Sequence, residues 1–272
     1  MLEKLVTIFV LFVMTLFPLR PSCAANKDSG AGRVTRQFTL GDLTLCITEA
    51  SPEGDYSLQF STGEQVLITG ECAFKTHEPE TFQNMPLPNC RTLMTYCFSG
   101  GAHCCTTLFI ATECGAGRSL DMVDLAHTNG KVRLADADGA QGKMIKVHDW
   151  QFAYYGTEDS QIQLSFADSP AMTRLLVFDN GHWRPDRIGE FSRFYSRLLR
   201  QTMHEARKGD LDLTASLAIK AAYYSLMSGK PVEKAVEVLS QLSPMQWKPQ
   251  SGKIIQDIQR AVIEFNPVEV IR

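Results

Sequence analysis

The sequence predicts an α+β protein in which a disulfide-stapled antiparallel β domain precedes a C-terminal four-helix unit. In residues 34–186, short runs of β-branched, aromatic and apolar residues alternate with turns rich in glycine, proline and aspartate. Such runs are typical of a meander, a sandwich or a partial propeller. In residues 187–272 the apolar residues recur at helical spacing instead. Apart from Cys23, every cysteine lies between Cys46 and Cys114, within the β domain.

The N-terminus has the features of a secretory signal peptide over residues 1–25. Lys4 precedes an apolar run at 5–17, and small residues follow up to Ala25. The run is shorter than the ~20 apolar residues that a membrane-spanning helix needs. Residues 26–33 are small and polar, so we expect a flexible segment after cleavage. The sequence therefore predicts a periplasmic or secreted protein whose mature chain has no transmembrane segment.

Cys23, near the end of the apolar run, would also permit a lipoprotein anchor. Arg20 and Pro21 stand where a lipobox has small or aliphatic residues, so cleavage after Ala24 or Ala25 is favoured.

The formal net charge is -3. This mild acidity gives no electrostatic reason to expect nucleic acid or anionic lipid as a partner. An envelope protein or a small ligand is the expected partner.

The β domain is organised around a predicted hairpin with strands at 92–97 and 108–112, separated by a Ser-Gly-Gly cluster. Residues 78–89 contain Pro79, Pro86 and Pro88 and predict a loop. Further strands are expected at 38–40, 43–47, 56–60, 65–69, 120–125, 131–134, 144–147, 150–155 and 174–178.

Four amphipathic stripes predict the helices. The first begins near Ile188 and ends at Lys208. Residues 229–231, Gly-Lys-Pro, separate the second from the third, because glycine suits a helix C-cap and proline suits a helix start. Prolines at 244 and 249 precede the last helix. The apolar positions are Phe191, Phe194, Tyr195, Leu198 and Thr202, then Leu213, Leu217, Ala221 and Tyr224, then Val232, Ala235, Val236, Leu239 and Leu242, then Ile254, Ile258, Ala261, Val262 and Phe265.

The seven cysteines of the mature chain predict a disulfide framework with one cysteine left over, because an exported protein meets oxidising conditions. If residues 99–103 form the hairpin loop, Cys97 lies opposite Cys105. In the same register Cys90 lies near Thr112. The expected bridges are Cys46–Cys72, Cys90–Cys114 and Cys97–Cys105 with Cys104 free, and the alternative is a bond between Cys104 and Cys105.

His103, Cys104 and Cys105 form the densest group of reactive side chains in the sequence. Imidazole and thiolates suit zinc or copper, but a tetrahedral site needs four ligands. A thiolate with His103 as its base would instead make a nucleophile. In the structural interpretation, adjacent strand residues point to opposite faces and serve different bridges. The structural interpretation is favoured. The chain has no Cys-x-x-Cys pair for a metal site, and the nucleophile has no recognisable local signature and would be prone to oxidation after export.

Residues 99–106, Ser-Gly-Gly-Ala-His-Cys-Cys-Thr, resemble the signature of a family of uncharacterised secreted bacterial proteins. The resemblance extends to an acidic loop at 136–139, to Phe-Ala-Tyr at 152–154 and to residues 165–171. It covers residues 91–186. The resemblance implies a secreted protein and adds no activity.

The acidic loop also resembles the calcium loop of FG-GAP or integrin-type propeller repeats. Asp136, Asp138 and Gly139 match that loop, whereas Ala140 and Met144 replace two of its oxygen donors. Calcium needs six to eight oxygen ligands, so the resemblance implies a propeller-like repeat with at most a weak calcium site. A solvated turn is favoured, and no other cofactor is expected.

Trp150, Phe152, Tyr154 and Trp183 are candidates for an aromatic binding surface that stacks on sugars or peptides. Alternatively, Phe152 and Tyr154 alternate along a strand and face a core, with Trp150 at its edge. The second alternative is favoured for these residues.

The helical pair at 213–242 resembles one tetratricopeptide-like hairpin. One pair cannot stack into a solenoid, because at least three repeats are needed to bury a continuous face. We expect it to cover the β domain or to offer a groove to a partner. The matching residues are Ala221, Tyr224, Leu226, Gly229 and Ala235.

The sequence as a whole predicts an exported cell-envelope protein. It favours a binding or assembly module over an enzyme, because no local catalytic signature is present. The alternative is an envelope thiol-redox or cysteine-dependent enzyme that uses His103 with Cys104 or Cys105.

Overall fold

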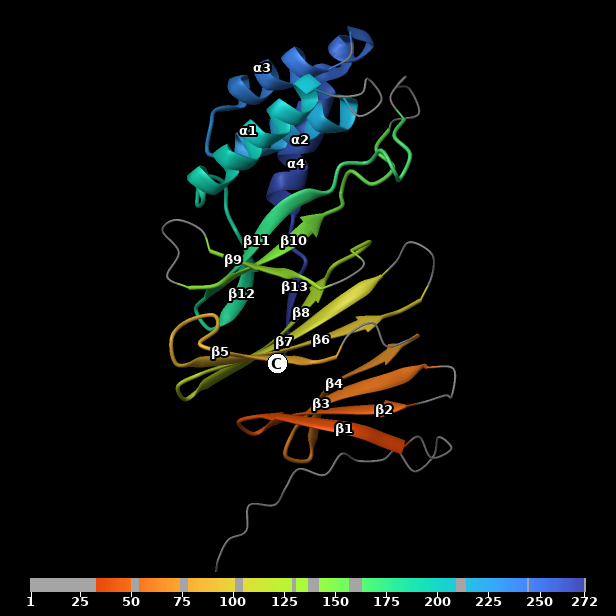
Figure 1. Ribbon diagram of the computed structural model, residues 1–272, viewed down its shortest axis with the longest axis vertical. Coiled ribbons are helices and arrows are strands. Elements are labelled where there is room, and N and C mark those ends of the chain that lie inside the picture. The colour runs from red at the N-terminus through yellow and green to blue at the C-terminus, as the bar shows by residue number, and fades with distance from the viewer. Residues whose placement is uncertain are drawn as a thin grey trace, which may run out of the picture.

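The computed structural model describes residues 33–49, 54–73, 78–100, 105–128, 131–136, 142–156, 163–208, 214–243 and 245–271. The molecule is elongated, with a four-stranded sheet at one end, two more sheets along the long axis and the α-helices at the other end (Figure 1). This arrangement confirms the predicted α+β class. No helix in the described part of the chain is long and apolar enough to cross a membrane.

The first sheet is an antiparallel meander whose strands pair in sequence order. Its core face follows the two-residue period of a half-buried strand, because Tyr56, Leu58 and Phe60 alternate with more exposed residues. The tight turn after the first strand places Gly41 at φ 61°, which glycine adopts without steric cost. The strands are β1 (Arg33–Leu40), β2 (Leu43–Glu49), β3 (Tyr56–Thr62) and β4 (Gln65–Cys72).

The central sheet has the order β13-β8-β7-β6-β5 and is built on the predicted hairpin. Its edge strand β5 lies within residues 78–89, so the expectation of a loop there is wrong in part. Proline is tolerated just outside a short edge strand, as Pro79 and Pro86 are here. The strands are β5 (Glu80–Gln83), β6 (Cys90–Phe98), β7 (Thr106–Cys114), β8 (Gly117–Asp124) and β13 (Val268–Ile271).

The register of the β6–β7 hairpin differs from the predicted one by two residues. Phe98 pairs with Thr106, and Cys97 pairs with Thr107 rather than with Cys105. The connection therefore runs over residues 99–105, which is longer than the five residues expected.

The third sheet has the order β12-β11-β10-β9 and lies between the central sheet and the helices (Figure 1). Asn180 and Gly181 connect its last two strands with φ of 52° and 86°. Positive φ at both central residues is what a two-residue hairpin turn of this kind requires. The strands are β9 (Arg133–Ala135), β10 (Met144–Asp149), β11 (Met172–Asp179) and β12 (His182–Pro185).

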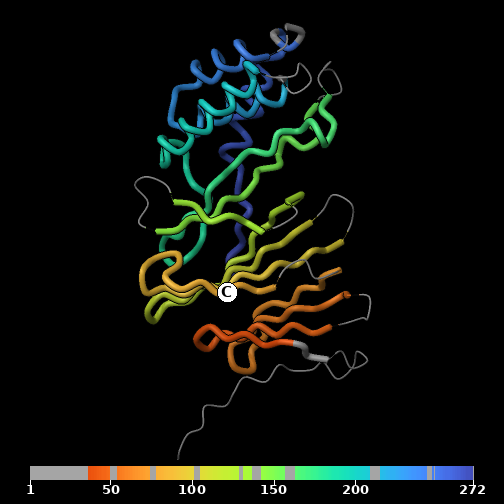
Figure 2. Tube along the Cα trace, viewed as in Figure 1, coloured from red at the N-terminus to blue at the C-terminus, as the bar shows by residue number. Residues whose placement is uncertain are grey.

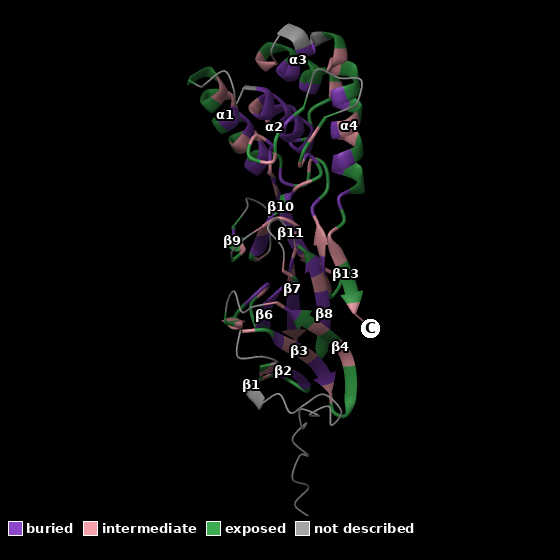
Figure 3. Ribbon diagram, turned by 90° about the vertical axis from the view of Figure 1, so that its right-hand side faces the viewer, coloured by how far each residue is buried: buried purple, intermediate pink, exposed green. Residues whose placement is uncertain are grey.

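The helices occupy the positions that the apolar stripes predict. A single core joins them to the third sheet, because Met172, Leu175 and Val177 of β11 belong to the same cluster of buried side chains as the helical residues. α2 is the most deeply buried helix (Figure 3). The helices are α1 (Ser192–Lys208), α2 (Thr214–Met227), α3 (Val232–Leu242), the 3₁₀ helix η2 (Met245–Gln250) and α4 (Ser251–Glu264).

The C-terminal segment leaves the helices and returns to the central sheet (Figure 2). There β13 pairs antiparallel with β8, with Val268 opposite Val123 and Ile271 opposite Leu120. The sequence predicts a purely helical unit over residues 187–272. This prediction is wrong at residues 268–271, which form a strand. The final strand is short, so its alternation was too brief to separate it from the preceding helical stripe.

Two disulfide pairings are established within the described residues. Cys90 is bonded to Cys114, as predicted, because these residues are paired directly across β6 and β7. Cys72 is bonded to Cys97, so the expected Cys46–Cys72 and Cys97–Cys105 bridges are wrong. The end of β4 lies beside the end of β6, where the Ala73 amide donates to the Phe98 carbonyl over 2.7 Å.

The Cys72–Cys97 bridge thus ties the first sheet to the central sheet. Cys46 and Cys105 are disulfide-bonded as well. No cysteine among the described residues has a free thiol.

Candidate functional site

A half-exposed group of aromatic side chains lies beside the third sheet, and we call it the aromatic surface. It consists of Trp150, Tyr154, Phe166 and His127. Trp150 directly follows β10, Tyr154 ends the turn that comes next, Phe166 lies in a later turn, and His127 follows β8. Three segments that are separate in sequence therefore contribute to one surface.

The rings of the aromatic surface pack on Phe166. The Trp150 ring stacks on it with centroids 5.4 Å apart and an interplanar angle of 13°. Tyr154 lies 5.4 Å from it on a tilted plane, and His127 contacts it edge-on at 5.1 Å. Stacked and edge-on contacts at these distances stabilise aromatic groups beyond the area they bury. The indole of Trp150 is also held in place, because its Nε1 donates to the Thr128 hydroxyl over 3.0 Å.

Residues 151–154 form a turn, so the prediction of a strand at 150–155 is wrong. The Gln151 amide donates to the Asp149 carboxylate over 2.9 Å, and the Ala153 amide donates to the Trp150 carbonyl over 2.8 Å. These bonds curl the chain away from β10. Alternation along a strand is lost, and Phe152 is buried while Tyr154 has 54% of its surface exposed.

Tyr154 has a backbone φ of 55°. A bulky residue in this left-handed region costs free energy, and such residues are found where the surrounding structure holds them in place. Here the Tyr154 amide donates to the Ser169 hydroxyl over 2.8 Å, and that hydroxyl donates to the Ser165 carbonyl over 2.7 Å. The turn therefore holds an aromatic ring at the surface in a conformation that glycine would adopt more easily.

The four predicted aromatic candidates divide into two pairs. Trp150 and Tyr154 come together on the aromatic surface. Phe152 and Trp183 lie in the core, each 1% exposed, and Trp183 donates its Nε1 to the Thr112 hydroxyl over 3.0 Å. Phe166 and His127 were missed, because nothing in a single sequence indicates that they approach Trp150.

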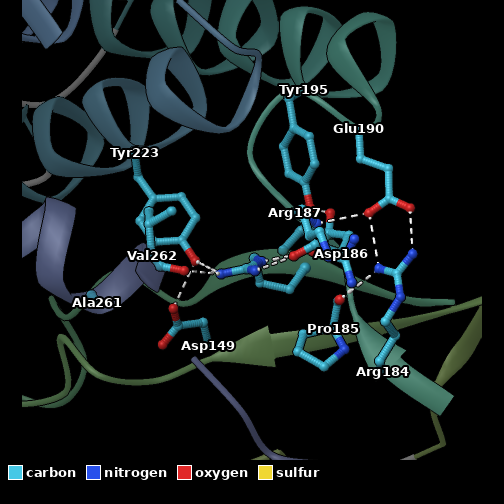
Figure 4. A network of polar contacts seen from close by, with 12 residues as sticks. Asp149, Arg184, Pro185, Asp186, Arg187, Glu190, Tyr195, Tyr223, Ala261 and Val262 are labelled. Atoms are coloured by element: carbon cyan, nitrogen blue, oxygen red, sulfur yellow. Dashed lines mark hydrogen bonds and ion pairs between the residues drawn. The ribbon is translucent and has the colours of Figure 1, made fainter. Parts of the chain in front are cut away.

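A buried polar network joins the third sheet to the helices (Figure 4). At its centre, Arg174 of β11 donates from Nε to Oδ1 of Asp186 over 2.8 Å and from Nη2 to the Asp186 carbonyl over 2.8 Å. Its Nη1 donates to the Tyr223 hydroxyl over 2.8 Å, and that hydroxyl donates to Asp149 over 2.7 Å. Tyr195 donates to the other carboxylate oxygen of Asp186.

The charges of this network are compensated within the protein. Burial alone would lower the pKa of Arg174, but Tyr223 and Asp186 raise it above its ordinary value, so the guanidinium is charged. Burial raises the pKa of Tyr223 well above its ordinary value. The ring of Phe265 lies 4.5 Å from the guanidinium and covers it. A buried charge paired in this way stabilises the position of its neighbours and leaves no reactive group for a substrate.

A second ion-pair group lies at the surface beside the network. Arg184 donates from Nε to Asp179 over 2.8 Å and from Nη2 to Glu190 over 2.8 Å. Burial acts to raise the pKa of Glu190. Two hydrogen bonds, one from the Arg184 side chain and one from the Arg187 amide, lower the pKa of Glu190 below its ordinary value. A cavity of about 430 Å³ lies next to this group, and Arg174, Arg184 and Asp186 contribute to its lining. These three residues already use their charges on protein partners.

Asp121 forms a further buried link, between the central and third sheets. Its side chain is 0% exposed, and it accepts hydrogen bonds from the Trp183 amide over 3.2 Å and from Nδ1 of His182 over 2.9 Å. Burial raises the pKa of Asp121, while the bonds to His182 and Trp183 act in the opposite direction. Among the described residues, the hydrogen-bond partner of the His182 ring is Asp121, and no serine or cysteine side chain is bonded to it.

Of the other residues that the sequence predicts for a site, some lie within the described residues and some outside them. His103, Cys104 and Asp138 lie outside the described residues. Cys105 is disulfide-bonded and therefore has no thiolate in this state. Asp136 is exposed and pairs with Lys143, whose Nζ lies 2.7 Å from its carboxylate. The described residues contain no group of three or more histidine, cysteine, aspartate or glutamate side chains that could hold a metal ion.

Comparisons with protein-family models, with curated proteins and with solved structures found no match. The chain is therefore defined by its own geometry, as an α+β protein with three antiparallel sheets, buried polar links and one exposed aromatic surface. The chemistry of the aromatic surface is directed outward, whereas the buried polar links are satisfied within the protein.

Proposed function

We propose that this protein is an exported binding module of the bacterial cell envelope, and that it binds its ligand on the aromatic surface. The observation that supports this most strongly is Tyr154, which is 54% exposed although its backbone has a φ of 55°. Backbone strain at a bulky residue points to a role for that residue, because glycine at the same position would remove the strain.

The ligand class follows from the chemistry of the surface. The stack of Trp150, Phe166 and Tyr154 presents an apolar face, and polar groups border it at Ser165 and Asp168. A sugar ring combines an apolar face with hydroxyl groups at its rim, so it fits both parts of this surface. Sugar-containing envelope polymers are therefore the proposed ligands.

Export is supported by the disulfides. Disulfides persist in oxidising compartments, and the Cys72–Cys97 and Cys90–Cys114 bridges would be reduced in a bacterial cytoplasm. The predicted signal peptide at 1–25 is consistent with this location. N-terminal sequencing of the exported protein should find Ala25 or Asn26 first. The relation to propeller repeats is a separate prediction, based on the sequence alone.

The proposal is tested by binding to isolated envelope polysaccharides. The wild-type protein is compared with Tyr154→Gly, which removes the ring and suits the positive φ, so the variant keeps its fold. The matched control is Ile263→Ser, which removes another exposed apolar side chain, 74% exposed, from a different region. We expect binding to be lost in Tyr154→Gly alone. Equal binding by all three proteins would refute the proposal.

A further inference from the structure

The outer face of α1 has a row of basic side chains that we call the arginine stripe. It consists of Arg193, Arg197, Arg200, His204 and Arg207, all of which are exposed. Their spacing of four, three, four and three residues places them on one side of the helix. At 1.5 Å per residue the stripe is about 21 Å long.

The opposite face of α1 is fixed in the core. Phe194, Tyr195, Leu199 and Thr202 are buried there. The stripe therefore has a fixed direction, because rotation of α1 would expose these side chains. Arg197 is further positioned by the Phe194 ring, whose centroid lies 5.6 Å from its guanidinium carbon.

The cations of the stripe are not compensated by neighbouring carboxylates. None of its four arginines lies within ion-pair distance of a carboxylate among the described residues. Glu205, the only acidic residue of α1, accepts instead from Gln201 over 2.9 Å. Many other surface cations are paired, as in Arg36–Glu78, Arg91–Glu113, Arg118–Asp42, Lys131–Glu80, Lys143–Asp136, Arg184–Glu190, Lys234–Glu237 and Lys253–Asp257. Among the described residues, exposed cations without such a pair, such as Arg133, Lys230 and Arg260, belong to separate parts of the chain and not to one row.

The charge of α1 also opposes the charge of the whole chain. α1 has five basic residues and one acidic residue, a net charge of +4, whereas the protein as a whole has a formal charge of -3. A concentrated positive field on a mildly acidic protein attracts anionic partners to one place and orients them there.

The first half of the stripe is concave. A cavity of about 330 Å³ is lined by Arg193, Arg197 and Arg200 together with Ser192 and Ser196. Guanidinium groups bind carboxylates through two parallel hydrogen bonds, and the serine hydroxyls can add to such contacts. The lining has no apolar side chain, so it suits a charged group and not an apolar one.

We propose that the arginine stripe is a docking surface for an acidic, extended segment of a partner protein. Side chains on one face of an extended segment recur about every 6.6 Å, and arginines four residues apart on a helix are about 6 Å apart along its axis. A segment of about six residues with acidic side chains at alternate positions would thus cover the stripe. This surface is separate from the aromatic surface and does not depend on it.

An anionic membrane fits the stripe less well. A helix that lies on a bilayer inserts its apolar face, and the apolar face of α1 is occupied by the core. None of the exposed large apolar side chains of the described residues belongs to α1. The membrane is therefore the alternative that the experiment has to exclude.

The test is fluorescence anisotropy with a fluorescein-labelled peptide of alternating glutamate and serine. The stripe variant is Arg193→Gln/Arg197→Gln/Arg200→Gln. The control variant is Arg133→Gln/Lys230→Gln/Arg260→Gln, which removes the same charge from other exposed positions. We expect the wild type and the control to bind alike and the stripe variant to bind about ten-fold more weakly, the combined effect of three exposed ion pairs. Binding should also weaken as salt is added.

Three results would overturn the proposal. If the control loses as much affinity as the stripe variant, or if the wild type does not bind the peptide, the surface is not a specific docking site. If vesicles of phosphatidylglycerol bind the wild type through the stripe while the peptide does not, the partner is a membrane. Unchanged far-ultraviolet circular dichroism of the variants confirms that the folds being compared are intact.

Discussion

Arg174 and Asp186 form an ion pair of 2.8 Å in which the side chains are only 2% and 0% exposed. Arg174 belongs to β11, and Asp186 follows β12 and precedes α1. With Tyr223 of α2 bonded to the same guanidinium, the pair connects the third sheet to the helices. One buried cation therefore adds a polar connection to the hydrophobic core that joins the helical part to the third sheet.

Arg174→Met should destabilise the protein strongly. The variant leaves Asp186 buried without its cation, and the loss of one partner from a buried pair costs about 3–5 kcal/mol. The control is Arg184→Met, whose ion pairs are more exposed and should cost about 1 kcal/mol or less. Urea denaturation followed by circular dichroism measures both, and a similar loss in the two variants would contradict the structural role of Arg174.

The tyrosines should make the protein sensitive to alkaline pH. Burial is the largest cause of raised pKa values in six of the seven tyrosines, and it raises the pKa of Tyr56 to about 12. A group whose pKa is raised by folding contributes stability below its unfolded pKa, here 10, and that contribution is lost as the pH rises toward the folded value.

Stability should therefore fall above pH ~10, the unfolded tyrosine pKa. The spectrophotometric titration of tyrosinate should show that most tyrosines ionise only as the protein unfolds, in a cooperative step. A gradual titration of all seven tyrosines near pH ~10 without loss of structure would contradict the burial of these hydroxyls.

The two resolved disulfides should differ in what they hold together. Their sequence separations are 25 and 24 residues. A disulfide lowers the chain entropy of the unfolded state, so removal of either bridge should lower the free energy of unfolding by about 3 kcal/mol. Of these two bridges, Cys72–Cys97 joins two sheets, whereas Cys90–Cys114 lies within one. Cys72→Ala/Cys97→Ala should speed hydrogen exchange throughout β1–β4, whereas Cys90→Ala/Cys114→Ala should affect β6 and β7. The same exchange pattern in both variants would show that the first sheet does not depend on this bridge.

Removal of β13 should expose an unpaired sheet edge. Truncation after Asn266 breaks the pairing of residues 268–271 with β8 and removes the Pro267 carbonyl, which accepts from the Asp124 amide over 2.9 Å. We expect a loss of at least about 2 kcal/mol, since each ladder bond contributes about 1 kcal/mol, together with association through the open edge. Glu269→Gln keeps the strand and is the control. Sedimentation measurements that find the truncated protein monomeric and equally stable would contradict this role.

Local patterns predicted the elements of this fold better than their pairing. Helical periodicity located all four helices, and glycine at 229 separated α2 from α3 because its φ of 81° suits the end of a helix. The β6–β7 hairpin was predicted but its register was off by two residues, since the length of a seven-residue connection cannot be inferred from a glycine pair. Cys97 consequently has a partner in β4 that no local pattern indicates.

The candidate site was harder to predict because its residues are separated in sequence. Trp150 and Tyr154 were identified by their aromatic character, but the turn between them depends on hydrogen bonds to Asp149 and Ser169. Arg174 did have a signal, because an arginine inside the apolar run of β11 implies a buried partner. The arginine stripe was readable from the same helical period as the apolar face of α1.

The most direct test of the binding function is a nuclear magnetic resonance titration of the protein with soluble fragments of an envelope polysaccharide. The three tryptophans provide an internal comparison, because Trp150 belongs to the aromatic surface while Trp183 and Trp247 are 1% and 4% exposed. The proposed function predicts saturable shifts of the Trp150 indole and the Tyr154 ring, with the other two indole signals unchanged. Saturable binding that leaves Trp150 and Tyr154 unshifted, or no binding to any fragment, would contradict it.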